Sequence, residues 1–257
     1  MAEPMTTSNL QDILPLVARG KVRDLYEVDP QTLLFVATDR ISAYDVIMAN
    51  PVPNKGTLLT LLTTHWFKIL TTAIPTLRTH FLTLDLPPQI PESLRPALQN
   101  RCMQVRKLKV FPIEAIVRGY ITGSAWKEYQ QSGTVHGMKM PEGLKESQRF
   151  PDGPIYTPST KAEQGEHDEN IHPDQAVTLL GPKYASIISS LALKLSAANY
   201  EVGKSQESFD KQFLRDWLVK SGLKGKDGVS MDEEVVRRTG EKYREAYEKI
   251  TGDTYAV

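Results

Sequence analysis

ILPLVARGKVRDLYEVDPQTLLFVA, residues 13–37, is the stretch that decides the fold of the first part of the chain. Short apolar runs alternate here with turn signals, because Arg19-Gly20 follows the first run and Asp29-Pro30 follows the second. Runs of roughly 4 to 8 residues bounded by turn residues are typical of strands joined by hairpins. The sequence therefore predicts an antiparallel meander of three strands, within residues 13–18, 22–28 and 32–37.

Further along, the hydrophobic spacing predicts a helix over 58–74, ending before Pro75, and strands within 77–86 and 102–121, the latter interrupted at Pro112. Ser124 is predicted to cap a short helix that Gly133 closes. Residues 137–173 are polar and without period, which is typical of a functional loop. The rest is predicted to be helical, over 183–198, 208–220 and 231–250, with Ser230 and Glu233 as a capping box.

The composition limits the class of protein. Of the 257 residues 40% are hydrophobic and 24% charged, and 31 cationic residues balance 31 acidic ones. These values exclude a disordered chain and an overall basic field that would attract nucleic acid or an anionic membrane. Cys102 is the single cysteine, and the first eleven residues lack the features of a signal peptide. We expect a soluble cytoplasmic protein with neither nucleic-acid nor membrane partners.

Several standard motifs are absent. Gly203-Lys204-Ser205 resembles the end of a P-loop, but Ala198 stands where that motif needs a glycine. His167 and His172 have the spacing of neither a zincin helix nor a zinc finger, and no cysteine partners accompany them. The chemistry must therefore come from other clusters.

The first such cluster is Gly20-Lys21-Val22-Arg23-Asp24, where one predicted strand turns into the next. A glycine lets the backbone approach a bound group, and Lys21 and Arg23 alternate along the strand, so both can reach phosphate oxygens from one face. An ordinary hairpin with solvated cations explains the local sequence as well and is the simpler interpretation.

TDRISAYD, residues 38–45, follows a predicted buried strand, the place where many enzymes carry functional loops. It contains two carboxylates, Arg40 and several hydroxyls, although Asp39 is equally suited to capping a turn. Lys55-Gly56 precedes the helix predicted to begin near residue 58, so a cation and free helix amides can meet an anion there.

Arg118-Gly119-Tyr120-Ile121-Thr122-Gly123-Ser124 runs from a strand end into a helix N-terminus. Unpaired amides at a helix start, the Ser124 hydroxyl and Arg118 together favour a bound phosphate. Capping alone accounts for Ser124 but not for the two glycines next to Arg118. We therefore interpret this segment as functional.

Residues 157–170, TPSTKAEQGEHDEN, hold the densest group of polar side chains. Four carboxylates, Lys161 and His167 in a long non-periodic segment suit Mg²⁺, an amino-acid substrate or both. A solvated acidic loop explains the same residues equally well.

Taken together, five segments closely resemble the SAICAR synthetase family in its fungal form: ILPLVARGKVRDLYEV, LLFVATDRISAYDVIM, IEAIVRGYITGSAWKEY, TPSTKAEQGEHDENI and SQESFDKQFLRDWL. The resemblance implies an α+β fold, with an N-terminal antiparallel sheet domain like a kinase small lobe (ATP-grasp-like) over 1–115. A mixed α/β domain ending in helices would occupy 116–257, with the ATP cleft between the two. It further implies an ATP-dependent ligase of purine biosynthesis that joins carboxyaminoimidazole ribonucleotide (CAIR) to L-aspartate through an acyl phosphate, with Mg²⁺, as a monomer or small homo-oligomer.

The resemblance also implies residue roles. Lys21, Asp39 and Lys161 would be catalytic. The residues expected at ATP are Gly20, Lys21, Val22, Arg23, Lys55, Glu114 and Ile116. Those expected at the other substrates are Arg40, Ser42, Arg118, Ser124, Glu163, Asp168, Asp210 and Lys211. For the metal, the chain offers only Glu163, Glu166 and Asp168 as candidates, because two carboxylate motifs of the family are missing.

Both missing motifs belong to an internal, strand-rich segment of roughly fifty residues, which the family carries after the helix ending near Ala198. Without this segment the strands next to it would lack pairing partners. From this departure, near residues 197–203, we expect a chain of reduced stability and impaired or absent turnover. The alternative function is a non-catalytic remnant that binds a nucleotide or a partner chain. A kinase-like phosphotransferase is a more distant alternative, since no His-Arg-Asp catalytic loop occurs.

Overall fold

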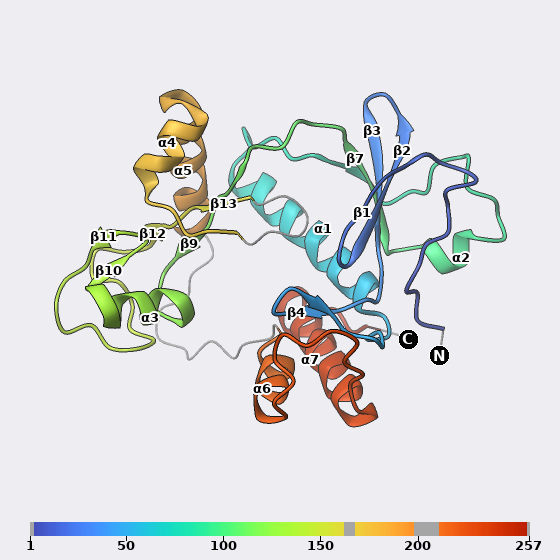
Figure 1. The fold of residues 1–257 in the computed structure, drawn as a ribbon. Coiled ribbons are helices and arrows are strands. Elements are labelled where there is room, and N and C mark those ends of the chain that lie inside the picture. Colours follow the sequence, from blue (N-terminus) through green and yellow to red (C-terminus); the bar gives the residue numbers. More distant parts are fainter. Residues whose placement is uncertain (1–2, 162–167, 198–210, 256–257) are drawn as a thin grey trace. The chain divides into compact units, whose positions relative to one another are not determined.

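The computed structural model describes residues 3–161, 168–197 and 211–255, which form two compact units (Figure 1). The first unit takes Met1–Leu108 together with Ser205–Val257, and the second takes Lys109–Lys204. The first boundary falls close to the predicted one at residue 115. The C-terminal part differs from the prediction, which assigned it to the second domain.

A five-stranded antiparallel sheet is the centre of the first unit. Its strand order is β1-β2-β3-β7-β6, and the bounds are β1 (Leu16–Arg19), β2 (Arg23–Asp29), β3 (Thr32–Ala37), β7 (Cys102–Arg106) and β6 (Phe81–Thr83). The meander predicted from residues 13–37 is thus confirmed, with Tyr26 opposite Leu34 in the register of β2 and β3.

The two faces of this sheet carry different side chains, because successive residues of a strand point to opposite sides. Leu34 and Val36 of β3 join a core cluster with Tyr26, which also includes Leu98 of the short helix α2 (Arg95–Leu98). Phe35 and Ala37 face the other side, where α1 (Lys55–Ala73) lies. This helix follows the predicted one closely and starts three residues earlier.

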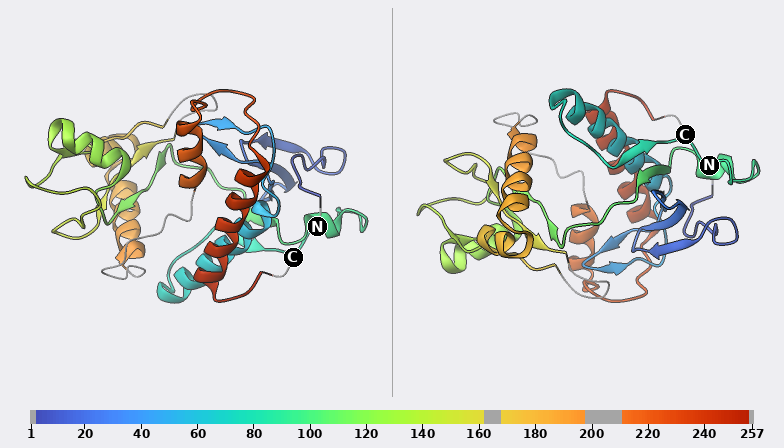
Figure 2. Two further views of the ribbon diagram at one scale, coloured as in Figure 1. Left: turned by 90° about the horizontal axis from the view of Figure 1, so that it is seen from below. Right: turned by 90° about the horizontal axis from the view of Figure 1, so that it is seen from above.

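The C-terminal helices complete the first unit. A second core cluster joins Ile41 and Leu58 to Leu214 of α6 (Gln212–Lys220) and Tyr243 of α7 (Glu233–Thr251). The hairpin of β4 (Ser42–Ala43) and β5 (Val46–Ile47) contributes to the same cluster. Figure 2 shows α7 beside α1. Burial of the apolar stripe of α7 against α1 explains why the C-terminal residues belong to this unit.

In its described residues the second unit is built from short two-stranded ladders and three helices. Its elements are β8 (Ile113–Glu114), β9 (Val117–Arg118), α3 (Gly123–Ser132), β10 (Thr134–Val135), β11 (Met138–Lys139), β12 (Ile155–Tyr156), β13 (Ser159–Thr160), α4 (Pro173–Leu180) and α5 (Pro182–Ala197). The strand region predicted over 102–121 is therefore broken into three pieces. Residues 107–111 are exposed and pair with no strand, and Pro112 lacks the amide that a ladder needs.

Two predicted caps are wrong. Helix α3 is preceded by Thr122, so Ser124 lies inside its first turn, and no side chain caps the helix. Helix α7 is preceded by Asp232, which places Glu233 at the first helical position instead of the third. In a capping box the partner stands three positions after the cap residue, and here the helix begins two residues later than the pattern suggested. None of the described helices is long and apolar enough to cross a membrane.

Candidate functional site

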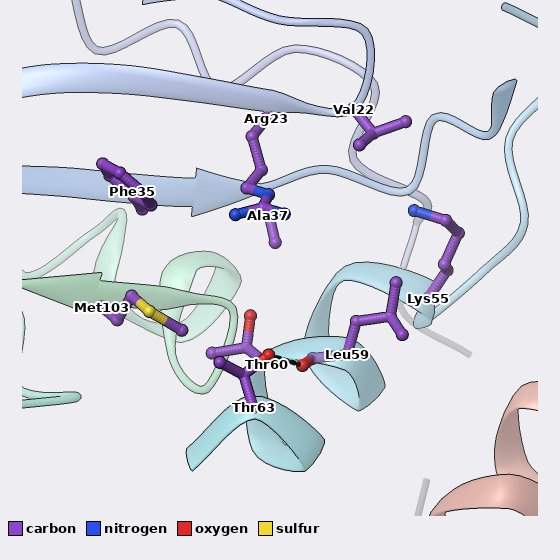
Figure 3. A pocket seen from close by; sticks show the side chains of 9 residues that line it. All are labelled: Val22, Arg23, Phe35, Ala37, Lys55, Leu59, Thr60, Thr63 and Met103. Carbon is purple, nitrogen blue, oxygen red and sulfur yellow. Dashed lines mark hydrogen bonds between the residues drawn. The ribbon is translucent and has the colours of Figure 1, made fainter. Parts of the chain in front are cut away.

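A pocket lies between α1 and the sheet of the first unit (Figure 3). Its volume is about 430 Å³, including the part that opens to solvent. The lining residues are Val22, Arg23, Phe35, Ala37, Lys55, Leu59, Thr60, Thr63 and Met103. The apolar side chains come from the sheet and from Leu59, while the cations come from the start of β2 and the start of α1. The pocket can thus take a flat apolar group at one end and an anion at the other.

Lys55 is the most unusual of these residues. It is the first residue of α1, its side chain is only 2% exposed, and Figure 3 shows its ammonium group on the side of Val22 and Arg23. Burial, the largest cause, and the charge of the neighbouring Lys211 together lower the pKa of Lys55 to about 8, although Asp39 opposes the shift. Among the described residues no hydrogen bond or ion pair engages this ammonium group. A buried cation without a counter-charge is a candidate binding site for an anion.

Two further cations accompany Lys55. Arg23 lines the same pocket, and desolvation lowers the pKa of its guanidinium. Lys211 comes from the C-terminal part of the chain, and its Nζ lies 3.4 Å from Oγ of Ser42. The structure therefore brings together Arg23, Lys55, Ser42 and Lys211, four residues that the sequence placed at ATP or at the other substrates. Asp210, the neighbour of Lys211, lies outside the described residues.

Gly56 fixes the start of α1 against the end of β3. A Cβ atom at this position would lie 2.2 Å from the carbonyl oxygen of Ala37, so no larger residue fits. Asn54, immediately before the helix, has φ of 63° and contributes no side-chain cap. The Gly56 amide instead donates to Oδ1 of Asp39 at 2.9 Å. The close approach positions the neighbouring Lys55, which lines the pocket.

Asp39 has a structural position that its predicted catalytic role does not account for. Its side chain is fully buried, and Oδ2 accepts a hydrogen bond from the Met5 amide at 2.9 Å and lies 3.2 Å from Nη1 of Arg101. The residue does not line the pocket. In this structure the Asp39 carboxylate accepts an amide of the first turn of α1, a distant segment, whereas the sequence had offered the capping of a local turn as the alternative to a catalytic role.

Arg40, predicted at the substrates, has its donor groups engaged by the protein. Its Nε donates to the carbonyl oxygen of Lys21 at 3.1 Å, and its Nη2 donates to that of Gly20 at 3.0 Å. Nη2 also pairs with Asp24 at 2.8 Å. Arg40 therefore holds the backbone of the Gly20–Val22 loop.

Lys21, within this loop, is held by the β4–β5 turn. Its Nζ lies 2.5 Å from Oδ1 of Asp45, and both side chains are about half exposed. Tyr44 and Asp45 have φ of 51° and 65°, the left-handed conformation of a tight hairpin turn. Gly20 does not adopt a positive φ, so its backbone conformation does not require glycine. Glycine matters here because it has no side chain: a Cβ atom would lie 3.3 Å from the Arg23 carbonyl oxygen.

The sequence did not single out the walls of the pocket. Phe35 and Met103 come from β3 and β7, while Leu59, Thr60 and Thr63 come from α1. One signal was available, because Lys55, Leu59 and Thr63 are spaced four residues apart and share one helix face. Asp24 belongs to the first cluster that the sequence singled out but was given no role there, because its burial cannot be recognised from the local pattern.

In the second unit, Arg118 is the residue with the clearest unmet hydrogen-bonding capacity. Its Nε is buried and has no partner among the described residues, and burial lowers the pKa of its guanidinium, while Glu128 opposes that effect. Ser124 is exposed in the first turn of α3, where the amides lack a side-chain cap. Within this unit Arg118 and the start of α3 are thus both available to an anion.

Other predicted residues of this unit have protein partners. Nζ of Lys161 lies 3.1 Å from Oε1 of Glu114, and both side chains are exposed. Glu114 pairs with Ser159 in the β8–β13 ladder, and the carbonyl oxygen of Ile116 accepts the Thr157 amide at 2.8 Å. The carbonyl of Ile116 is thereby engaged within this unit.

The metal candidates cannot be assembled from the described part of the chain. Glu163 and Glu166 lie outside the described residues, as does the rest of 162–167, and Asp168 is exposed. Over residues 3–161, 168–197 and 211–255, no group of three His, Cys, Asp or Glu side chains is placed to hold a metal ion. These residues therefore do not form a protein cage for Mg²⁺.

Comparison with known proteins gives a consistent result. The sequence model of the SAICAR synthetase family matches residues 16–202. A phosphoribosylaminoimidazole-succinocarboxamide synthase from Cyberlindnera jadinii is 50% identical over 299 residues, covering 96% of this chain and 98% of that protein. The enzyme of the same name from Saccharomyces cerevisiae is 48% identical over 307 residues, covering 98% and 99%.

A solved structure also matches: a SAICAR synthase from Saccharomyces cerevisiae complexed with SAICAR. It has a TM-score of 0.85 and 45% identity, covering 98% of this chain and all of that one. The sequence matches run over 299 and 307 residues, whereas this chain has 257. The relatives therefore contain positions that have no counterpart here.

Proposed function

The chain belongs to the SAICAR synthetase family, and from this premise we propose how its residues divide the work of the reaction. The function of the family is the ATP-dependent condensation of CAIR with L-aspartate in purine biosynthesis, and this function is assigned to the chain. The substrates are small molecules. The roles given to single residues below are proposals.

The observation that carries the proposal is Lys55, a buried ammonium group with a lowered pKa and no ion-pair partner among the described residues, in a pocket that Arg23 also lines. We assign the polyphosphate of ATP to this end of the pocket. The side chains of Lys55, Arg23 and Lys21 would neutralise its charge. Lys21 would have to break its ion pair with Asp45 in order to reach the phosphates. The apolar walls formed by Phe35, Leu59 and Met103 suit the nucleoside end.

The reaction needs positioning and charge neutralisation more than a protein nucleophile. An oxygen of the CAIR carboxylate attacks the γ-phosphorus, the bond to the β-phosphate oxygen breaks, and ADP leaves. The amine of aspartate then attacks the carbonyl carbon of the acyl phosphate, the new C–N bond forms, inorganic phosphate leaves, and the nitrogen loses its proton. The cations at the ATP phosphates favour the first step because they stabilise the charge that develops on the leaving ADP.

We assign the phosphate of the ribonucleotide to Arg118 and the start of α3. The support is the buried Nε of Arg118, which has no partner among the described residues, together with a helix start that no side chain caps. A phosphate bound there would accept hydrogen bonds from the Arg118 guanidinium and from the amides of the helix start, and would offset the free-energy cost of burying the guanidinium. Ser124, exposed in the same turn, would add a hydroxyl donor.

Mg²⁺ is part of the proposal only as a partner of the nucleotide. The described residues do not fit a protein metal cage, and Mg²⁺ commonly binds through substrate phosphates and one or two carboxylates. No step above depends on it. The cytoplasmic location and the monomeric or small oligomeric state are likewise proposals that rest on the sequence.

The test is ADP release by the purified 257-residue chain with ATP, Mg²⁺, L-aspartate and CAIR, each omitted in turn. Release that requires all of them would support the ligase function, would contradict the impaired turnover expected from the missing segment, and would make the positions present only in the longer relatives dispensable. A folded chain that binds ADP without turnover would favour the non-catalytic alternative, in which the chain shares the ancestry of the family but not its activity. A folded chain that binds neither ADP nor CAIR would overturn both functions.

A further inference from the structure

The N-terminal segment Met5–Ser8, called the N-terminal strap below, lies outside the residues 16–202 that the family model matches. It is nevertheless tied to the loop and the helix start that form the cationic end of the pocket. Three side chains make the connection: Asp39, Arg40 and Asp24.

The first connection runs through Asp39 to α1. The Met5 amide donates to Oδ2 of Asp39 at 2.9 Å, and the Asp39 amide donates back to the Met5 carbonyl oxygen at 2.7 Å. The other carboxylate oxygen accepts the Gly56 amide, one residue from Lys55. Because Asp39 is fully buried, its orientation determines where the first turn of α1 begins.

The second connection runs through Arg40 to the loop Gly20–Val22. One guanidinium group donates from Nη1 to the Thr6 carbonyl oxygen of the strap, and from Nε and Nη2 to the carbonyl oxygens of Lys21 and Gly20. The planar fork of arginine holds its bonded partners in a fixed mutual arrangement. The strap and the loop therefore share a single rigid clamp.

The third connection fixes Arg40 itself. Asp24, fully buried, accepts Ser8 Oγ at 2.6 Å on one oxygen and pairs with Nη2 of Arg40 at 2.8 Å on the other. Burial alone would raise the pKa of Asp24, but the hydrogen bonds from Arg40 and Ser8 outweigh it and lower that pKa. Asp24 is thus ionised at neutral pH, and the strap contributes directly to its stabilisation.

We propose that the N-terminal strap is a positioning element of the nucleotide site, acting through Arg40, Asp24 and Asp39 to set the Gly20–Val22 loop and Lys55 for the phosphates of a nucleoside triphosphate. This proposal rests on the proposed function. None of the residues that line the pocket belongs to the strap, so its effect is on the placement of the groups that bind phosphate. Loss of the strap would weaken nucleotide binding and leave the ribonucleotide site of the second unit unchanged.

The experiment measures the affinities of ADP and of CAIR for four folded proteins by calorimetry: wild type, a chain lacking residues 2–8, Arg40→Lys, and a control lacking residues 2–3. The control keeps every strap contact described above. We expect the 2–8 deletion and Arg40→Lys to weaken ADP binding about tenfold, since each removes several charge-assisted contacts, with CAIR binding unchanged. Ser8→Ala, which removes a single hydroxyl, should show a smaller loss of ADP affinity in the same direction.

The outcomes separate a positioning role from a merely structural one. A strap that only stabilises the fold would lower the melting temperature and leave the ADP affinity of the folded protein intact, and that result would overturn the proposal. If the deletion does not fold, Arg40→Lys and Ser8→Ala decide by the same criterion. A wild-type chain that binds CAIR but not ADP would overturn the proposed nucleotide site, and the role of the strap with it.

Discussion

Nη1 of Arg101 lies 3.2 Å from Oδ2 of Asp39, and both side chains are buried. The carboxylate also accepts the amides of Met5 and Gly56. This arrangement joins the N-terminal segment, the loop after β3, the start of α1 and the residue before β7. Asp39 is therefore expected to act on stability first and on the reaction only through the groups it positions.

Replacement of Asp39 by Asn should lower the free energy of unfolding by about 3 kcal/mol, because it leaves the Arg101 charge buried without its partner. Urea denaturation of the variant measures the loss. Asp12→Asn, at an exposed position, is the matched control and should unfold like the wild type. A change below about 1 kcal/mol would mean that water or another group already screens Arg101.

Lys55→Met should separate stability from function. Methionine fills similar space without a charge, so the variant should gain on the order of 2 kcal/mol at neutral pH, the cost of keeping a buried ammonium group protonated. Binding of ADP should fall at least about tenfold, because a phosphate contact is lost. Lys68→Met, at an exposed position of the same helix, should change neither quantity. Unaltered ADP affinity in Lys55→Met would remove Lys55 from the site.

Nucleotide binding should take up a proton in alkaline solution. The pKa of Lys55 is about 8 in the folded protein against an ordinary value of 10.5. A bound phosphate favours the charged form, so at about pH 9 binding should draw up to one proton, and at about pH 6.5 none. Calorimetry in two buffers of different ionisation enthalpy measures the uptake. Equal apparent enthalpies at the higher pH would contradict it.

The same shift predicts how stability depends on pH. Between about 8 and 10.5 the unfolded chain binds more protons at Lys55 than the folded one does, so this residue makes the free energy of unfolding rise with pH across that window. Lys55→Met should lack this contribution, and comparison of the two proteins by urea denaturation isolates it from other titrating groups.

Gly56→Ala should be strongly destabilising, by about 3 kcal/mol, because the added Cβ would lie 2.2 Å from the Ala37 carbonyl oxygen and would force α1 away from β3. Gly240→Ala provides the contrast. Its Cβ would lie 3.6 Å from Val52, an ordinary contact, and alanine favours a helix by about 1 kcal/mol over glycine. Thermal unfolding of both variants checks the pair, and equal effects would show that the close approach at Gly56 relaxes at little cost.

Arg118→Lys should weaken CAIR binding about tenfold and leave ADP binding unchanged, since lysine keeps the charge but loses the Nε donor. Arg149→Lys, an exposed substitution in the same unit, is the control. A parallel loss of ADP affinity would show that Arg118 does not act on the ribonucleotide alone.

The sequence by itself determined the antiparallel meander, the helix α1 and the cationic segments of the site. Two-residue alternation and helical spacing are local properties of the sequence. Over residues 13–37 the apolar runs and turns are so close together that antiparallel pairing of neighbouring strands is the simplest arrangement, and the structure has it. The family followed from the density of motifs in the same way. Short, isolated ladders such as β8 with β13 could not be predicted from the sequence, because a strand of two residues is too short to show an alternation of apolar and polar side chains.

Tertiary structure alone decided the roles of Asp39 and Arg40 and the position of the C-terminal helices. A carboxylate in a loop becomes a ligand or a cap according to what surrounds it, and the partners of Asp39 come from Met5, Gly56 and Arg101, far apart in the chain. The apolar stripe of α7 can be recognised in the sequence, but the sequence does not show that this stripe packs against α1. Side-chain chemistry is a local property, whereas burial and pairing depend on contacts between distant residues. These contacts set the pKa of Lys55 and the placement of the Gly20–Val22 loop that Arg40 holds.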